Sequence, residues 1–343
     1  MSHNLEVVAG KVQHVYVGDE PWHGLGKRVH HDLTPAQMMK EAGLDWSVAK
    51  GPLSVDAYDK KTKKTSRVKF PKWRGLYRVS DDPEKNGTPL TIVGRGWEPI
   101  QNEEFVNFFH DFVMAGDMEM HTAGAICDPN TGDFYTWMLA KIKSNVFEAV
   151  KDDVIESFML FSNPFIYGKK ADIRQTNTRV VCNNTLDVAL YSHSKASIKV
   201  GHRQKFDAEA VKRALNVNSE SMQKYKDAAK FLVSKRAKPE SVMDYFRTLH
   251  PASGKKGEKG ELSSISSMFA DALEKQPGAE FGRGTWWQAF NATTYAYDHM
   301  VGSKNYDEEL DERANRLVKS WYGHGRSGKV KSLELALDYA KAA

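Results

Sequence analysis

The stretch RQTNTRVVCNNTLDVAL, from Arg174 to Leu190, is the part of the chain on which the fold prediction turns. Val180, Leu186 and Leu190 are spaced for one side of a helix, so the pattern predicts a helix here. The pair Asn183-Asn184 is costly inside a helix, because asparagine side chains compete for backbone hydrogen bonds. The stretch therefore favours a binding surface over an enzyme active site.

The composition of the whole chain is that of an ordinary soluble globular protein. Its 343 residues, 41% hydrophobic and 27% charged, leave room for two domains or one large one. The net charge of +5 permits a nucleic acid or another polyanion as partner. Cys127 and Cys182 lie far apart in no metal-binding spacing, which favours a reducing cytosol. We expect neither a signal peptide nor a membrane span, because no suitable apolar run is present.

The sequence pattern in the first part of the chain predicts strands interrupted by two helices. Leu33–Leu44 is a predicted helix capped by Thr34. From Trp46 the period of the pattern changes to two, which predicts a meander of antiparallel strands with one long basic hairpin. Asn102–Gly116 is a second predicted helix, capped by Asn102, and further strands follow it.

After Phe206 the pattern becomes helical. Asn216–Asn218 is a possible break in the first helical segment, and the Gly- and Lys-rich stretch 251–261 predicts a flexible loop. Trp321–Lys329 is interpreted as a link between two helices. The predicted fold class is α+β: an antiparallel β-meander with a long basic hairpin packed on helices, then a C-terminal helical portion. The predicted domains are 1–206, an α+β sheet domain with a nucleic-acid-binding groove, and 207–343, a helical domain.

The strongest electrostatic feature is a cluster of cations within the predicted hairpin. Phosphate backbones favour such clusters because each neutralised phosphate releases counterions. Phe70 and Trp73 are interleaved with the cations and offer stacking surfaces for unpaired bases. The alternative is a solvated hairpin tip whose lysines only maintain solubility. The cluster contains no acid and consists of Lys60, Lys61, Lys63, Lys64, Arg67, Lys69, Lys72 and Arg74.

A second, looser basic set surrounds the opening stretch. The set consists of Lys169, Lys170, Arg174, Arg179, Lys195, Lys199, Arg203 and Lys205. Arg174 and Arg179 are candidate phosphate ligands. Asn183 and Asn184 can either contact a nucleic acid or bridge neighbouring backbone inside the fold.

Catalytic interpretations are weak. Cys182 has no neighbour that would activate it, and a cysteine on an apolar helix face is more often a core residue. The histidines show no metal-binding spacing with acidic partners. A nuclease that uses Asp128, Asp133 or His121 stays a minor alternative, because no carboxylate pair implies two metal ions.

Four segments together resemble a known family. They are PWHGLG (Pro21–Gly26), GLYRVS with TIVGRGWEPIQNEEF (residues 75–105), RVVCNNTL (Arg179–Leu186) and the C-terminal run from NATTYAYDH (residues 291–299) onward. The chain resembles, over almost its whole length, the phage/plasmid-like protein family classed as domain of unknown function 932. That resemblance implies a bacterial cytoplasm. The family is also remotely similar to phage-type single-strand annealing proteins, which implies a basic groove and assembly into rings or filaments.

The leading hypothesis is a non-enzymatic protein that binds single-stranded DNA and promotes annealing in phage or plasmid recombination. Phosphates would lie between the basic hairpin and the helix of the opening stretch, with Trp73 stacking on bases. We expect a homo-oligomer, no membrane association and no required cofactor. The alternative is a protein-interaction or host-takeover factor of a mobile element that does not bind DNA.

Overall fold

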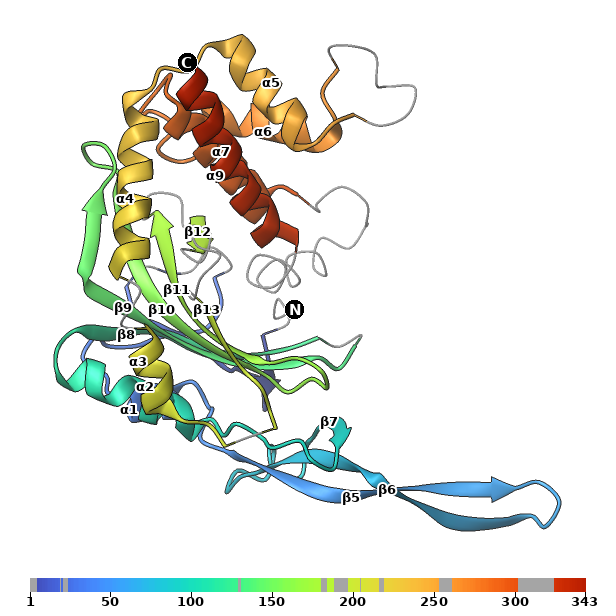
Figure 1. Ribbon diagram of the computed structural model, residues 1–343. Helices are drawn as coiled ribbons and strands as arrows, with labels where there is room; N and C mark the ends of the chain where they lie inside the picture. The colour runs from blue at the N-terminus through green and yellow to red at the C-terminus, as the bar shows by residue number, and fades with distance from the viewer. Residues whose placement is uncertain are drawn as a thin grey trace. The chain divides into compact units, whose positions relative to one another are not determined.

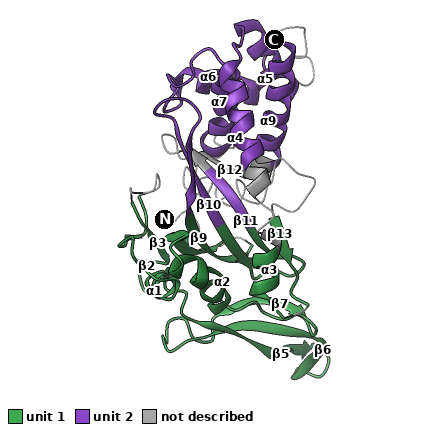
Figure 2. Cartoon of the chain, turned by 60° about the vertical axis from the view of Figure 1, so that its left-hand side comes forward, with its two compact units in different colours: residues 1–141, 160–173, 197–214 green, residues 142–159, 174–196, 215–343 purple. Residues whose placement is uncertain are grey.

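The protein has a mixed α+β fold, with several sheets and eight helices in the part of the chain described here. The computed structural model describes residues 5–18, 20, 24–128, 131–179, 184–187, 197–203, 205–215, 219–252, 261–301 and 324–343. These residues form two compact units, shown in Figure 2. Unit 1 comprises residues 1–141, 160–173 and 197–214, and unit 2 comprises 142–159, 174–196 and 215–343.

The largest sheet has eight strands, and its order is β12-β11-β10-β9-β8-β3-β4, with β13 paired to β11 (Figure 1). The strands are β3 (His14–Tyr16), β4 (Lys27–Arg28), β8 (Met118–Cys127), β9 (Phe134–Glu148), β10 (Val154–Pro164), β11 (Ala171–Arg179), β12 (Asn184–Asp187) and β13 (Ser197–Val200). A separate two-stranded sheet pairs β1 (Val7–Val8) with β2 (Lys11–Val12).

The helix predicted for Arg174–Leu190 is wrong. Residues up to Arg179 belong to strand β11, and Asn184–Asp187 form β12, which pairs antiparallel with it. Asn184 begins strand β12, so the cost of this asparagine inside a helix does not arise. The polar residues of β11 through Asn177 are buried, because this strand lies inside the sheet. Val180, Cys182 and Asn183 lie outside the described residues.

A three-stranded antiparallel sheet in unit 1 consists of β5 (Ser47–Asp59), β6 (Lys64–Val79) and β7 (Pro89–Gly94). Figure 1 shows β5 and β6 as a long two-stranded ribbon joined by the turn at residues 60–63. Their register runs from Ser47↔Val79 to Asp59↔Lys64 and shifts between Pro52 and Leu53, where the bulge on β6 spans residues 71–73. We use the name ribbon for residues 53–70, beyond this bulge, and root for the part before it.

Helix α1 (Pro35–Glu41) begins as the sequence predicts. Thr34 is its N-cap and forms a capping box with Gln37, with proline in the first turn. The hydroxyl of Thr34 accepts the Gln37 backbone N–H at 3.3 Å, and the Gln37 side chain accepts the Thr34 N–H at 2.9 Å. Two otherwise unpaired backbone donors are satisfied in this way.

Substituting Thr34 with alanine is expected to lower the free energy of unfolding by about 1 kcal/mol, since the side-chain half of the capping box is lost. Urea denaturation followed by circular dichroism measures the change. Thr34→Ser keeps the accepting oxygen and serves as the control, with an expected change of only a few tenths. Equal losses in both variants would contradict the capping role.

Helix α2 (Glu103–Met114) also lies where the sequence places it, but its predicted cap acts differently. The Asn102 side chain makes no capping hydrogen bond to its own helix. It is buried, and its amide donates to the carbonyls of Leu44 at 3.0 Å and Trp46 at 3.3 Å. Its oxygen accepts the Thr136 hydroxyl at 3.1 Å. Asn102 therefore joins three distant segments of unit 1. Helix α3 (Ala208–Leu215) also lies in unit 1, except for its last residue.

Unit 2 contains helices around a core built on two tryptophans. The helices are α4 (Ser219–Ser234), α5 (Pro239–Leu249), α6 (Ser264–Lys275), α7 (Trp286–His299) and α9 (His324–Ala342). Trp286 and Trp287 are completely buried, and the Trp287 indole N–H donates to the Asp153 carboxylate at 2.8 Å. These two tryptophans are core residues.

The predicted link at Trp321–Lys329 is wrong from His324 onward, because α9 begins there. Lys329 is buried in this helix and pairs with Asp298 at 2.6 Å. Lys329 and Asp298 thus form a buried ion pair. Residues 302–323 and residues 253–260 of the predicted loop lie outside the described residues. None of the described helices is both long and apolar enough to cross a membrane.

Candidate nucleic-acid interface

The cations that the sequence assigns to the hairpin lie at the tip, along one strand of the ribbon and at the bulge. Lys60, Lys61, Lys63, Lys64, Arg67, Lys69 and Lys72 are all exposed. Within the part of the chain that the structure describes, the four lysines of the tip form no ion pair. Their charge is therefore available to an anionic ligand.

The acids on the opposite strand neutralise little of this charge. Asp56 lies 3.6 Å from Arg67, and both side chains are well exposed, so the pair is weak. Asp59 closes the turn: its carboxylate accepts the backbone N–H groups of Lys61 at 2.8 Å and Thr62 at 3.3 Å. These hydrogen bonds, that of Lys61 first, lower the pKa of Asp59. Asp59 thus orders the tip that carries the lysines.

The ribbon has two chemically different faces, because paired residues of two strands point to the same side. The pairs Ser54↔Lys69, Asp56↔Arg67 and Tyr58↔Thr65 share the polar face. The pairs Leu53↔Phe70, Val55↔Val68 and Ala57↔Ser66 share the other, which is mainly apolar. Val55, Val68 and Phe70 are exposed on that apolar face. A solvated hairpin that only maintained solubility would not require an exposed apolar face.

Arg74 and Trp73 lie at the bulge and differ in accessibility. The Arg74 guanidinium donates to the carbonyls of Pro71 at 3.0 Å and Trp73 at 2.7 Å, so it is partly engaged in shaping the bulge. The Trp73 side chain is 38% exposed and meets Tyr167 edge to face, with ring centroids 5.5 Å apart. Tyr167 belongs to the loop that carries the exposed residues Lys169 and Lys170. The structure thus brings this second basic loop to the root of the ribbon.

Sequence reasoning missed Tyr167, although it noted the loop's lysines. The available signal was an aromatic residue beside Gly168-Lys169-Lys170 after a buried strand. Arg203 is exposed and follows His202, whose ring stacks on Trp97 with centroids 4.0 Å apart. This stacking places the segment that carries Arg203 next to Trp97, which follows shortly after the end of β7.

The predicted role of Arg174 requires correction. Its side chain is only 1% exposed within β11, so a phosphate in solution cannot reach it in this conformation. The side chain of Arg179 lies outside the described residues, as does Lys195. Lys199 and Lys205 are exposed. Of the two candidate clusters, the hairpin set and the 169–170 loop remain accessible and adjoin in unit 1.

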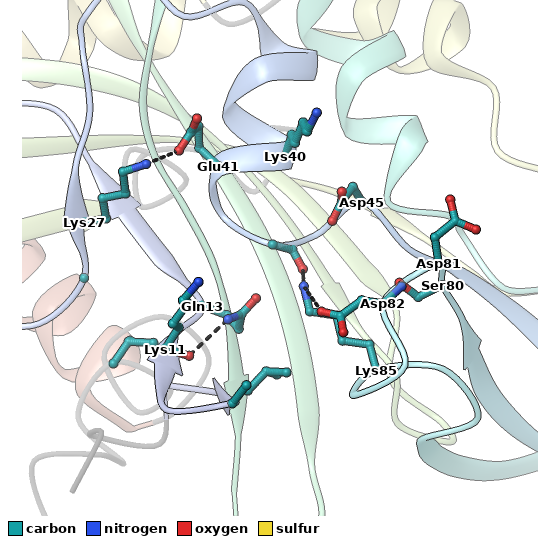
Figure 3. Close-up of a pocket in the computed structure, with 15 residues that line it drawn as sticks. Lys11, Gln13, Lys27, Lys40, Glu41, Asp45, Ser80, Asp81, Asp82 and Lys85 are labelled. Carbon is teal, nitrogen blue, oxygen red and sulfur yellow. Dashed lines mark hydrogen bonds and ion pairs between the residues drawn. The ribbon is translucent and has the colours of Figure 1, made fainter.

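Unit 1 also contains a cavity of about 710 Å³, shown in Figure 3. Both acidic and basic side chains line the cavity, and some of them pair with each other. Lys27 pairs with Glu41 at 2.5 Å, and the buried Lys85 ammonium donates to the Gly43 carbonyl at 2.8 Å. This mixture selects no single ligand charge, and the cavity is therefore a weaker candidate than the ribbon.

Catalytic and metal-binding groups are sparse in the described residues. The only described cluster of potential metal ligands is His30, His31 and Asp32, consecutive and fully exposed residues. Burial raises the pKa of the Cys127 thiol, which disfavours the reactive thiolate. Neither feature provides a built catalytic site.

Comparison with known proteins identifies one family. A family model with the description "Domain of unknown function (DUF932)" matches residues 89–321. No curated protein and no solved structure gives a significant match. Strands β5 and β6 precede the matched residues, so the match carries no argument about the ribbon. Because the match covers more than half of the sequence, the chain belongs to the family of domain of unknown function 932.

Proposed function

We propose that the protein binds single-stranded DNA and promotes its annealing in phage or plasmid recombination. The observation that carries this proposal is the exposed ribbon, which has lysines without ion-pair partners among the described residues at its tip. Such a surface suits a phosphate backbone, because each contact releases condensed counterions. No bound cofactor is needed for this electrostatic function.

In this proposal the phosphates lie along the tip and polar face of the ribbon and reach the loop with Lys169 and Lys170. Backbone contacts of this kind position a strand without reading its sequence. Bases held by their backbone stay accessible to a complementary strand, which is the requirement for annealing. Assembly into a ring or filament in a bacterial cytoplasm belongs to the same proposal, through the resemblance to phage annealing proteins.

Replacing Lys61, Lys63 and Lys64 with alanine is expected to weaken binding of a 20-nucleotide single strand roughly 100-fold at 0.1 M salt. The estimate follows because each lost phosphate contact removes about 0.7 from the slope of log affinity against log salt, or about 2 for three contacts. Titration by fluorescence anisotropy at several salt concentrations measures both quantities.

The matched control removes three exposed lysines of unit 2, Lys230, Lys238 and Lys331. It changes the net charge by the same amount but leaves the ribbon intact. If both triple variants lose affinity equally, general charge and not the ribbon determines binding. If the unaltered protein does not bind the strand at low salt, the proposed function is wrong.

A second candidate function is binding of a protein partner, and the apolar face of the ribbon favours it. Exposed Val55, Val68 and Phe70 on an otherwise solvated ribbon are typical of a surface that another protein covers. Val55→Gln with Val68→Gln makes this face polar without changing the charge of the ribbon, and so separates the two functions. Loss of a stoichiometric, nuclease-resistant partner with unchanged DNA affinity would support the protein-interaction function.

A further inference from the structure

The outer face of the β5–β6–β7 sheet at the root combines exposed aromatic side chains with glycines. Side chains alternate along β6, so Trp73, Gly75 and Tyr77 point to one side and Leu76 and Arg78 to the other. The second side is buried, whereas Trp73 and Tyr77 are 38% and 36% exposed. The sheet is therefore fixed to unit 1 through one face and presents the other to solvent.

Glycines on the neighbouring strands give this outer face its shape. Gly51 pairs with Gly75, and the Tyr77 ring passes 3.2 Å from the position of a Cβ at Gly51. Gly94 pairs with Trp73, and the Tyr167 ring lies 3.7 Å from the corresponding position at Gly94. The two tyrosine rings therefore lie over glycine positions, where the backbone carries no side chain.

Gly75 is the open position between these rings. A Cβ at Gly75 would meet no atom within 4 Å. Trp73 and Tyr77 stand two residues away on either side, or roughly 7 Å along a strand. A planar group about as thick as one aromatic ring can thus enter above Gly75 and contact either side chain.

We propose that this face is a stacking platform for unpaired nucleobases, formed by Trp73, Tyr77 and Tyr167 around Gly75. The inference rests on the proposed function and gives it a ligand class. Phosphates attached to the stacked bases are neutralised by Lys72, Lys169 and Lys170, which are exposed next to Trp73 and Tyr167. The aromatic face alone selects no charge, but these cations favour a polyanion that carries flat apolar rings.

The platform favours single strands over duplexes. In a duplex both faces of each base are already stacked on neighbours, so a protein ring gains access only after unstacking, which costs a few kcal/mol. Stacking on a protein side chain is also tolerant of sequence, because every base has an aromatic face. Annealing needs this tolerance, since any sequence must be held and released.

The decisive probes are a 20-nucleotide thymidine strand and an abasic strand with the same number of phosphates. The unaltered protein is expected to bind the thymidine strand at least 10-fold more tightly than the abasic strand, because only the former can stack. The triple lysine variant Lys61→Ala, Lys63→Ala and Lys64→Ala is expected to bind both strands more weakly and to keep the ratio of the two affinities. Anisotropy titration gives all four affinities.

Two platform variants are expected to reduce the ratio of affinities for the thymidine and abasic strands towards one. Trp73→Ala removes a stacking ring, and Gly75→Val fills the open floor with a side chain that strands accommodate and whose Cβ meets no atom within 4 Å. Both variants are expected to keep the thermal unfolding midpoint of the unaltered protein. Val79→Ala, on the same face but farther from Gly75, is the matched control and is expected to keep the ratio.

The outcomes separate the two proposals. Equal affinity of the unaltered protein for the thymidine and abasic strands overturns the stacking platform but leaves phosphate binding intact. A base preference that survives in both Trp73→Ala and Gly75→Val also overturns the platform. Absence of binding to either strand at low salt overturns the proposed function and, with it, this inference.

Discussion

Replacing Arg78 with alanine is expected to lower the free energy of unfolding by about 3–5 kcal/mol, because the substitution leaves a carboxylate buried without its counter-ion. The guanidinium is 2% exposed and lies 2.5 Å from the Glu6 carboxylate. It is enclosed between the rings of Trp46 and Phe134, whose centroids lie 4.6 Å and 4.4 Å away. Those rings interact with the cation and offset part of the cost of removing it from water.

The control for this prediction is Arg67→Ala, which removes an arginine from the same strand. Its pair with Asp56 is exposed, so a loss below about 1 kcal/mol is expected. The double variant Glu6→Leu with Arg78→Met is expected to recover most of the lost stability, because no charge then remains buried. Urea denaturation measures all three variants. A loss in Arg78→Ala no larger than in Arg67→Ala would contradict the buried-pair account.

Arg78 also connects the stability of unit 1 to the proposed site. It lies on β6 one residue after Tyr77, so its buried pair fixes the strand whose opposite face carries Trp73 and Tyr77. A two-stranded ribbon is marginal in water by itself. The exposed part of β6 therefore depends on this anchor at the root for its orientation.

The elements that the sequence predicts correctly are those determined by neighbouring residues. The helix at Leu33–Leu44 depends on Thr34, Gln37 and the first-turn proline, all within one turn. Helix α2 shows an apolar face of Phe105, Phe108 and Phe109 at helical spacing. These signals are local, so no knowledge of the tertiary fold is required.

The incorrect predictions concern residues whose roles depend on distant partners. The sequence cannot show that Asn102 reaches Leu44 and Trp46, more than fifty positions away. It also cannot show that Arg174 lies inside a sheet, since an arginine next to polar residues is normally exposed. For Arg174–Leu190, the apolar spacing was a poor guide, because residues 174–179 and 184–187 form two paired strands.

The candidate site was predictable only in part for the same reason. The cation cluster is visible in the sequence, because lysines on a hairpin tip remain exposed in almost any fold. The platform is not, because Tyr167 meets Trp73 across nearly a hundred residues. Tyr77 and Arg78 point to opposite faces in any strand, but the sequence does not show that the face of Arg78 is the one packed against Trp46 and Phe134.

Lowering the pH from 7 to 5 is expected to remove about 4 kcal/mol from the free energy of unfolding of unit 1, about 2 kcal/mol for each of two buried histidines. Burial lowers the pKa of His14 to about 4, against a hydrogen bond to the Leu25 carbonyl that raises it. Burial likewise lowers the pKa of His202, stacked on Trp97, to about 4.

The direction of this pH dependence follows from the pH at which the folded and the unfolded state each take up a proton. An unfolded histidine is protonated below its ordinary pKa of about 6.5, whereas the folded state resists protonation until about pH 4. Between these values the unfolded state binds more protons, so stability is complete above pH 6.5 and falls as the pH decreases. Carboxylates contribute little above pH 5, because most titrate near 4.

The variants His14→Gln and His202→Gln isolate the two contributions. Glutamine does not titrate between pH 5 and pH 7, and it places a neutral amide near the carbonyls that the two Nδ1 atoms contact, Leu25 for His14 and Glu98 for His202. Each is expected to flatten the stability difference between pH 7 and pH 5 by about 2 kcal/mol, measured by urea denaturation at both values. A pH dependence as steep in both variants as in the unaltered protein would show that other groups cause it. A flattening confined to His202→Gln would instead place the acid-sensitive contact between Trp97 and the segment that carries Arg203, next to the end of β7.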